Sequence, residues 1–263
     1  MTPASVADPI RLGTRASLLA RTQSATVGDA LAAVAGRPWA EVLITTSGDD
    51  TSKPLSQPGT PGLFVSTLRQ ALLAGEVDVI VHSFKDLPSA PEPGITIAAV
   101  PRREDPRDAL VSRDGIRIED LAPGCVIGTS SPRRAAVIAR RWPNLVVQPV
   151  RGNVDSRIRK VRDGECDAVV LAMAGIVRIG RQDEVTQVFE VGEMLPAPAQ
   201  GALAVECRSD DDAMLALLSL LDNAPARLAT AAERQVLVGI NAACTTAVGA
   251  SASYLDGILT VRA

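Results

Sequence analysis

Short apolar runs alternate with stretches of helical spacing along most of the chain, and this alternation is the feature that most constrains its fold. Two of the runs, 125–128 and 145–150, each lead into an arginine-bearing segment that begins a helical stretch. Strands that alternate with helices build open α/β sheets, in which ligands bind beside the carboxyl ends of the strands. The pattern therefore predicts α/β units with a ligand site next to these two segments.

The core must be built from small and branched aliphatic side chains, because 46% of the 263 residues are hydrophobic and only 2% are aromatic. Such a composition favours parallel strands covered on both faces by helices, and the length suggests more than one domain. A net charge of −3 without a basic stripe argues against a nucleic-acid partner.

Targeting and metal chemistry are constrained by what the sequence lacks. The first ten residues hold no apolar stretch of signal-peptide length and no later run approaches a membrane span, so we expect a cytoplasmic protein. The four cysteines are widely separated, which argues against zinc sites and disulfides. His82 is the only histidine, so neither a histidine-rich metal site nor a Ser-His-Asp triad is expected.

The expected elements follow from periodicity and from glycine and proline signals. Strands are expected at 10–13, 41–46, 77–82, 95–100, 125–128, 145–150, 167–171, 202–207, 248–253 and 257–261. Helical stretches are expected at 17–35, 62–75 and 210–239, with another ending near 180. Residues 47–61 resemble a long lid-like loop, and 101–107 and 194–201 resemble crossings between domains.

The first arginine segment has the chemistry of an anion site. Ser131 and Pro132 match the preferences for the cap and first position of a helix, where backbone N–H groups and the helix dipole stabilise an anion. Arg133 and Arg134 add forked donors that suit a carboxylate or phosphate. The alternative is an ordinary capped and charged helix. In the second segment Arg151 and Arg157 flank a glycine, which is a weaker signal by itself.

Two further residues could carry chemistry. Asp86 follows a strand directly and could stabilise a cation or handle a proton, although aspartate is also an ordinary turn residue. Cys244 lies among small polar residues, where a thiol could act as a nucleophile, although most free cysteines are small buried hydrophobes.

Several motifs occur in a fixed order along the chain. They are Lys85-Asp-Leu-Pro88, Gly128-Thr-Ser-Ser-Pro-Arg-Arg134, Arg151-Gly-Asn-Val-Asp-Ser-Arg157, Leu195-Pro-Ala-Pro-Ala-Gln-Gly-Ala202 and Cys244 before Val248-Gly249, with Gly13-Thr-Arg-Ala-Ser17 and Thr46-Ser-Gly-Asp49 nearer the start. This order closely resembles the porphobilinogen deaminase family, also called hydroxymethylbilane synthases, from about Arg11 to the final residue.

The resemblance implies a transferase of tetrapyrrole (haem) biosynthesis. Such enzymes join four porphobilinogen units head to tail with loss of ammonia and release the linear tetrapyrrole hydroxymethylbilane. The growing chain is anchored on a dipyrromethane cofactor that is made from the substrate and held by a thioether to one cysteine, here Cys244. We expect a monomer that binds porphobilinogen, with no metal, nucleic-acid or membrane partner.

The resemblance also assigns roles to individual residues. Asp86 is matched to the catalytic carboxylate that holds pyrrole N–H groups and stabilises the developing cation. Besides Cys244, the residues matched to cofactor binding are Ser83, Lys85, Thr129, Ser130, Ser131, Arg133, Arg134, Arg151 and Gly152. Those matched to substrate binding are Arg15, Ser17, Phe64, Arg157, Arg178 and Gln200.

The implied fold is α/β, with two periplasmic-binding-protein-like α/β domains flanking a cleft and a small third α+β domain. Domain 1 is expected at 1–101 and 202–220, domain 2 at 102–195, and domain 3 at 224–263. Family members continue for several tens of residues, so the third domain is expected to be truncated here and activity impaired. Ala243 replaces the usual glycine before the cysteine, and Gln57 and Pro61 occupy lid positions where many relatives have lysine.

Two other functions fit parts of the sequence. A non-catalytic, two-lobed anion- or solute-binding or sensor domain would have the same architecture but no need of Cys244 or of the Asp86 loop. A phosphate-transferring enzyme could use the helix start at Ser131, but it would need metal-binding carboxylates nearby, and the sequence offers no convincing pair.

Overall fold

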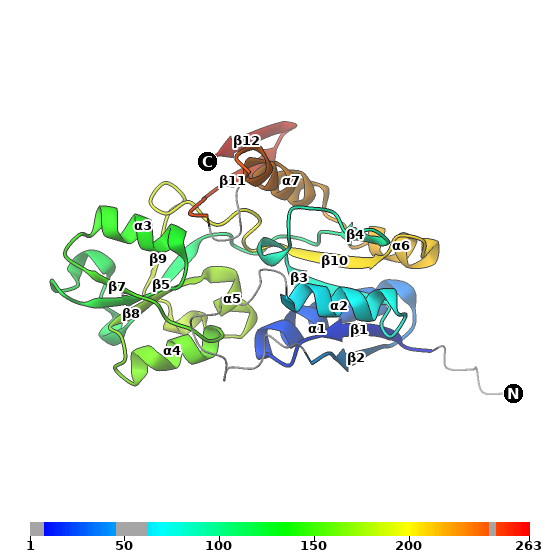
Figure 1. Ribbon diagram of the computed structural model, residues 1–263, viewed down its shortest axis with the longest axis horizontal. Helices are drawn as coiled ribbons and strands as arrows, with labels where there is room; N and C mark the ends of the chain where they lie inside the picture. Colours follow the sequence, from blue (N-terminus) through cyan, green and yellow to red (C-terminus); the bar gives the residue numbers. More distant parts are fainter. Residues whose placement is uncertain (1–7, 46–62, 242–245) are drawn as a thin grey trace, which may run out of the picture. The chain divides into compact units, whose positions relative to one another are not determined.

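The computed structural model describes residues 8–45, 63–241 and 246–263. They form two compact units, each with its own five-stranded sheet (Figure 1). Unit 1 comprises Met1–Arg102 and Leu203–Arg227, and unit 2 comprises Arg103–Ala202 and Leu228–Ala263. The three-domain division expected from the sequence stays a prediction.

Unit 1 is a mixed sheet with helices on both faces. Its strands in spatial order are β2 (Trp39–Leu43), β1 (Ile10–Thr14), β3 (Val79–Ser83), β10 (Leu203–Arg208) and β4 (Ile95–Ala99). Strand β1 is parallel to both β2 and β3, whereas β10 is antiparallel to β3 and β4. Its helices are α1 (Leu18–Ala35), α2 (Leu63–Leu73), the short 3-10 helix η2 (Phe84–Asp86) and α6 (Asp212–Ser219).

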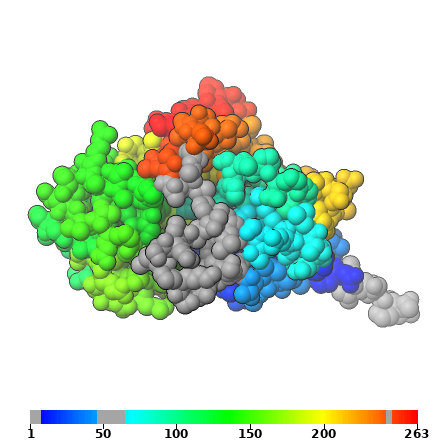
Figure 2. All heavy atoms as spheres, in the orientation of Figure 1, coloured from blue at the N-terminus to red at the C-terminus, as the bar shows by residue number. Residues whose placement is uncertain are grey.

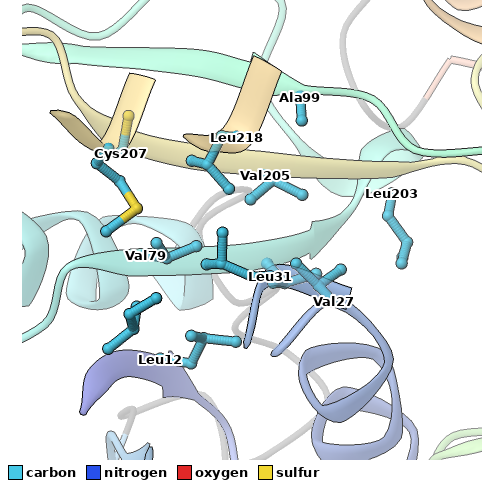
Figure 3. Packing of buried hydrophobic residues seen from close by; sticks show 12 residues of the cluster. Leu12, Val27, Leu31, Val79, Ala99, Leu203, Val205, Cys207 and Leu218 are labelled. Carbon is cyan, nitrogen blue, oxygen red and sulfur yellow. The ribbon is translucent and has the colours of Figure 1, made fainter. Parts of the chain in front are cut away.

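The alternation of side chains along β3 divides the core of unit 1 between the two faces of its sheet. Val79 packs with Leu31 of α1 and Leu218 of α6 (Figure 3). The next residue, Ile80, packs on the other face with Leu72 of α2. Burial on both faces explains why the β3 sequence is a continuous apolar run.

Unit 2 repeats this plan. Its strands in spatial order are β7 (Val146–Gln148), β6 (Val126–Gly128), β8 (Ala168–Ala172), β5 (Asp108–Ser112) and β9 (Gln187–Val188). Strand β6 is parallel to β7 and β8, and β5 is antiparallel to β8 and β9. Its helices are η3 (Arg113–Gly115), η4 (Ile118–Asp120), α3 (Pro132–Arg141), α4 (Val154–Arg162), α5 (Met173–Arg178) and η5 (Gln182–Glu184).

The core of unit 2 also lies on both faces of its sheet. Val170 of β8 packs with Ile138 of α3, and its neighbour Val169 packs on the opposite face with Ile158 of α4. Two α/β units of this kind confirm the fold class predicted from the sequence.

Helix α7 (Ala224–Gly239) contributes residues to both units, and the chain ends in an antiparallel hairpin of β11 (Ser251–Leu255) and β12 (Ile258–Arg262). Every residue of β12 is exposed, and its atoms (red) lie on the surface in Figure 2. The stretch 210–239, predicted to be largely helical, is two helices separated at 220–223. The side chain of Asn223 accepts a hydrogen bond from the Ala226 amide at the start of α7 (3.0 Å).

Several strand predictions need correction. Strand β9 was not expected, and the strand predicted at 248–253 begins at Ser251 in β11. Strand β2 starts at Trp39, two residues before the expected 41, because β1 pairs in parallel from Ile10↔Trp39 and because the Trp39 ring packs over Gly28 of α1. A Cβ on Gly28 would lie 2.5 Å from that ring. Strand β5 was not expected, since 101–107 indicated only a crossing. Both β5 and β10 run antiparallel to their neighbours, which the composition did not predict.

Candidate functional site

The two arginine-bearing segments of unit 2 begin at the same edge of its sheet. Strands β6 and β7 are adjacent and parallel, with Gly128 opposite Gln148 at their carboxyl ends. The chain leaves these strands into the segments 128–134 and 151–157, which lead into α3 and α4. This arrangement confirms the prediction that both segments lie at the carboxyl ends of neighbouring strands.

Hydroxyl groups hold the start of α3 in place. The Ser131 side chain caps the helix by accepting from the Arg134 amide (3.5 Å), and Pro132 occupies the first turn. The Ser130 hydroxyl donates to the Val150 carbonyl (2.7 Å), which ties this loop to the end of the neighbouring segment. Thr129 accepts from the Ser131 amide (3.2 Å) and is buried. The assignment of all three hydroxyls to the cofactor stays a prediction.

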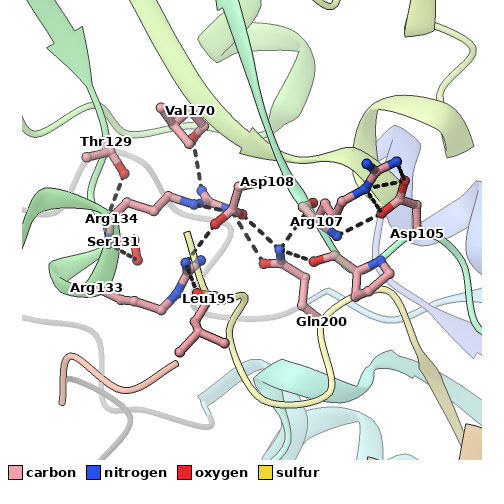
Figure 4. Close-up of polar contacts among 11 residues, drawn as sticks. Asp105, Arg107, Asp108, Thr129, Ser131, Arg133, Arg134, Val170, Leu195 and Gln200 are labelled. Atoms are coloured by element: carbon pink, nitrogen blue, oxygen red, sulfur yellow. Dashed lines mark hydrogen bonds and ion pairs between the residues drawn. The ribbon is translucent and has the colours of Figure 1, made fainter. Parts of the chain in front are cut away.

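Arg133 and Arg134 are both buried and share one carboxylate, that of Asp108 at the start of β5 (Figure 4). Arg134 donates to Asp108 Oδ1 through Nη2 (2.7 Å) and Nε (3.1 Å), and Nη1 donates to the Val170 carbonyl (2.9 Å). Nη1 of Arg133 lies 2.7 Å from Asp108 Oδ2 and donates to the Leu195 carbonyl (2.5 Å).

The electrostatics of this group favour charged side chains. Burial by itself would raise the pKa of Asp108, but the charges of Arg134 and Arg133 outweigh it and lower the pKa to about 2. Burial lowers the pKa of Arg133; the charge of Asp108 opposes this effect and that of Arg134 adds to it. One anion and two cations therefore share a water-poor environment.

Gln200 lies in the same group and is fully buried. Its side-chain nitrogen donates to the Pro106 carbonyl (2.7 Å) and to Asp108 Oδ1 (2.8 Å), and its oxygen is 3.4 Å from Nη2 of Arg134. These contacts link Gln200 to the Asp108 ion pairs. Its assignment to substrate binding stays a prediction.

Arg157 and Arg178 have carbonyl partners, but neither has a carboxylate within ion-pair distance among the described residues. Arg157 donates to the Gly152 carbonyl (2.8 Å), and Arg178 donates to the Gly201 carbonyl (2.6 Å). Burial lowers the pKa of Arg157, and the charge of Arg134 lowers it further. Burial also lowers the pKa of Arg178, to about 10, against the opposing charge of Glu104.

The first three residues of the second segment, 151–153, are exposed. Arg151 and Gly152 both lie at the surface, before Asn153, which caps α4 by accepting from the Ser156 amide (2.8 Å). Gly152 has a φ of 115°, and a Cβ there would lie 2.1 Å from the Ser156 hydroxyl oxygen. Local geometry thus requires the glycine, whatever else approaches it.

In unit 1 the candidate residues follow two adjacent parallel strands, β1 and β3. Ser17 caps α1 by accepting from the Ala20 amide (3.3 Å), and the Ser83 hydroxyl accepts a hydrogen bond from the Gln23 amide nitrogen (3.0 Å). Asp86 is exposed at the end of η2. Arg15 and Lys85, both half-buried, lie on the same two loops. The structure therefore groups these five residues of unit 1 at one sheet edge.

Some predicted residues lie beyond what the structure describes. Cys244 and its neighbour Ala243 fall outside the described residues, as do Gln57 and Pro61. Phe64 belongs to α2, but its side chain is not described.

Sequence reasoning missed Asp108. It directly follows the charged stretch that indicated a crossing, and an aspartate there carries no ligand-site signal. Its position is informative only once β5 is known to be antiparallel, because an antiparallel strand begins at the edge where its parallel neighbours end.

A second missed group lies in unit 1, where Glu206 of β10 is buried between two basic side chains. Nη2 of Arg69 is 2.6 Å from Glu206 Oε1, and His82 Nε2 is 3.3 Å from Oε2. The lone histidine therefore contacts a buried carboxylate. No cluster of three or more His, Cys, Asp or Glu side chains suited to a metal ion occurs in the described part of the chain.

The fold and the arginine-bearing edge define a class: proteins built from two mixed α/β units, one of which carries two buried arginines at the carboxyl ends of its parallel strands. Solved structures agree on the fold. The methionine-binding protein MetQ matches with a TM-score of 0.51 at 10% identity, covering 81% of this chain and 89% of MetQ. A periplasmic substrate-binding protein of an ABC transporter from Coxiella burnetii matches with a TM-score of 0.50 at 15% identity, covering 86% and 96%.

Sequence comparisons identify the family. Residues 10–216 match the family model described as porphobilinogen deaminase, dipyromethane cofactor binding domain. The porphobilinogen deaminase of Nocardia farcinica (strain IFM 10152) is 52% identical over 258 residues, 98% of this chain and 74% of that protein. That of Thermobifida fusca (strain YX) is 53% identical over 248 residues, 94% and 78%.

The chain belongs to the porphobilinogen deaminase family. It is thereby a transferase of the hydroxymethylbilane synthase type, and the matched segment is the part of the family that binds the dipyrromethane cofactor. The family match favours this function over the non-catalytic binding domain that the sequence left open. No helix among the described residues is both long and apolar enough to cross a membrane.

Proposed function

We propose that the arginine cluster of unit 2, defined as Arg133, Arg134, Arg157 and Arg178, binds the carboxylates of the dipyrromethane cofactor and of the growing pyrrole chain. Porphobilinogen carries an acetate and a propionate on each ring, so negative charge accumulates with every addition. A guanidinium can hold a carboxylate through two parallel hydrogen bonds. The cluster is therefore matched in charge and in geometry to such a polymer.

One observation carries this proposal: the cluster holds more buried cations than anions. Asp108 is the single carboxylate within ion-pair distance of the four guanidiniums among the described residues. Arg157 and Arg178 are partly buried without such a partner, and the buried Nε of Arg133 has no hydrogen-bond partner. Buried charges are normally paired, so an anionic ligand would complete the arrangement.

The cofactor supplies the anchor on which the pyrrole chain is extended, and we propose that Cys244 carries it through a thioether. This role rests on the motif around Cys244 and on the match to the cofactor-binding family model. The exposed Arg151 and the backbone at Gly152 belong to the same segment as Arg157, and they would add further hydrogen-bond donors for the cofactor. Thr129 and Ser131 would add hydroxyl donors, and the Ser130 oxygen would add an acceptor, because its hydroxyl already donates to the Val150 carbonyl.

In unit 1 we propose that Asp86 is the catalytic carboxylate. Its exposure leaves the oxygens accessible to a ligand. A carboxylate that accepts hydrogen bonds from pyrrole N–H groups stabilises the positive charge that develops on a pyrrole nitrogen when the ring attacks as a nucleophile. Arg15, Ser17, Ser83 and Lys85, which lie at the same sheet edge, would bind substrate or cofactor carboxylates.

The test compares two arginines on one helix. Arg157→Gln removes a partly buried guanidinium that has no carboxylate partner among the described residues, whereas Arg159→Gln removes one whose side chain is 66% exposed and pairs with Asp155. Denaturing mass spectrometry of protein supplied with porphobilinogen measures the covalently attached dipyrromethane. We expect attachment in wild type and in Arg159→Gln, and slow or absent attachment in Arg157→Gln. A wild-type protein without the added mass would contradict the proposal.

The remaining predictions are also part of the proposal. We infer that the protein acts on porphobilinogen in the cytoplasm and as a monomer. Phe64 and Gln200 are retained as substrate-binding candidates on the basis of their motifs. The proposed monomer can be checked by light scattering of the purified protein.

A further inference from the structure

Asp108 occupies an unusual place for a residue that belongs to the binding edge of unit 2. It is the first residue of β5 and pairs with Ala172, the last residue of β8, because the two strands are antiparallel. The start of β5 therefore coincides with the edge at which β6 ends and α3 begins. Asp108 is fully buried there.

The Asp108 carboxylate makes different contacts with its two arginines. Oδ1 accepts from both Nε and Nη2 of Arg134, so this edge of the Arg134 guanidinium is taken by the protein itself. Arg133 instead approaches Oδ2 through Nη1, the same nitrogen that donates to the Leu195 carbonyl. Figure 4 shows both guanidiniums joined to the Asp108 carboxylate by dashed lines.

The contacts of Arg133 leave its other edge open. Nε is buried and has no hydrogen-bond partner, and Nη2 makes no hydrogen bond among the described residues. A guanidinium has five N–H donors, and the pair on Nε and Nη2 matches the two oxygens of a carboxylate. Arg133 thus keeps its two-point donor edge, whereas that of Arg134 is occupied.

We propose that Asp108 is a positioning residue for cofactor assembly: it occupies the Nε–Nη2 edge of Arg134 and fixes Arg133 so that its own Nε–Nη2 edge receives a ligand carboxylate. This assignment rests on the proposed function of the arginine cluster, and it gives Arg133 and Arg134 different roles. Arg134 is held within the protein, because it also hydrogen-bonds to Gln200 and to the Val170 carbonyl. Arg133 makes the contact with the ligand.

The charge of Asp108 is essential to this arrangement. Without it, two buried guanidiniums would be neighbours with no anion between them, and each would move toward water or toward another acceptor. The Asp108→Asn variant keeps the size of the side chain and removes the charge. Glu206→Gln is the matched control, because Glu206 is a buried carboxylate paired with Arg69 in unit 1 and lies outside the arginine cluster.

The first experiment measures the rate of dipyrromethane attachment from porphobilinogen by denaturing mass spectrometry, together with the thermal midpoint. Both variants are expected to lose thermal stability. Asp108→Asn should attach the cofactor roughly tenfold to a hundredfold more slowly than wild type, the range expected for loss of a charge-assisted hydrogen bond. Glu206→Gln should attach it at nearly the wild-type rate. Wild-type attachment in folded Asp108→Asn would overturn the proposal, as would equal slowing in both variants.

The second experiment uses the wild-type protein and so does not depend on the folding of a variant. The Nε resonances of Arg133 and Arg134 are recorded by ¹⁵N NMR before and after cofactor attachment. We expect the Arg133 resonance to shift and the Arg134 resonance to stay nearly constant. A shift of Arg134 equal to or larger than that of Arg133 would overturn the assignment. If neither resonance shifts and Arg157→Gln attaches the cofactor normally, the proposed function itself fails.

Discussion

Replacement of Arg178 by methionine should stabilise the cofactor-free protein and weaken its function. Burial lowers the pKa of Arg178 to about 10, and its one hydrogen bond to a described residue goes to the Gly201 carbonyl (2.6 Å). This pKa lies well below that of an ordinary arginine, so at roughly 1.4 kcal/mol per pH unit the charged form is penalised by about 3 kcal/mol in the fold. The lost hydrogen bond offsets about 1 to 2 kcal/mol of this.

The net expectation is a gain of about 1 to 2 kcal/mol in the free energy of unfolding for Arg178→Met. The sign holds at neutral pH, because Arg178 is charged in both the folded and the unfolded chain there. The penalty is therefore fully present below pH 10 and is relieved only as the pH rises through the folded-state pKa of about 10. The gain should thus be independent of pH between about pH 6 and pH 8.

The assay is urea unfolding of cofactor-free protein. Arg141→Met in α3 is the control, because the Arg141 side chain is 42% exposed and its nearest carboxylate, on Glu193, is 3.8 Å away. This control should change stability by less than about 0.5 kcal/mol. Arg178→Met should also attach the cofactor more slowly. A less stable cofactor-free Arg178→Met protein that attaches the cofactor at the wild-type rate would refute the reasoning.

Three other changes test separate parts of the structure. Glu206→Gln should cost about 3 to 5 kcal/mol in urea unfolding because it leaves Arg69 buried without its close partner, and a loss below about 1 kcal/mol would show that water screens the pair. The folded-state pKa of Asp108 is about 2, below its unfolded value, so the stabilisation that its charge provides should be present above about pH 4 and fade toward pH 2. When acid unfolding is followed by circular dichroism, the stability of Asp108→Asn should therefore fall less steeply with decreasing pH than that of wild type. Asp86→Asn should keep the attached cofactor in mass spectrometry while turnover falls by a factor of about 100 or more, and near-normal turnover would remove Asp86 from the mechanism.

Local chemistry made much of the binding edge predictable from the sequence. The cap at Ser131 and the proline after it define the start of α3 through contacts within a few residues, and the structure contains that cap. The glycine after α1 likewise ends the helix with a φ of 63°. Features set by neighbours in sequence are visible to reasoning from sequence, because their determinants lie inside one short window.

Features set by distant segments were not predictable in this way. The start of β2 depends on the packing of Trp39 over Gly28, and the role of Asp108 depends on the direction of β5. The sequence indicated that Arg133 and Arg134 are equivalent donors, since they are adjacent. Only the fold shows that a carboxylate from another strand occupies the donor edge of one and leaves that of the other open.

Buried ion pairs are the clearest example of a feature that could not be predicted from the sequence. His82 was significant in the sequence only as a lone histidine that excluded metal sites and triads. In the structure it contacts Glu206. Burial by itself would raise the pKa of Glu206, but the contacts with His82 and Arg69 outweigh burial and lower it. Glu206 lies in an apolar run that predicted only a strand, and its partners come from β3 and from α2. Pairing of this kind is a property of the tertiary structure.

The central claim is that the arginine cluster of unit 2 binds the carboxylates of a pyrrole ligand. A crystal structure of the cofactor-loaded protein tests it most directly. We predict dipyrromethane carboxylate oxygens within about 2.7 to 3.2 Å of Nε and Nη2 of Arg133 and of the Arg157 guanidinium, with Arg134 still paired to Asp108. Cofactor carboxylates held by other residues, with Arg133 and Arg157 unchanged and away from the ligand, would contradict it.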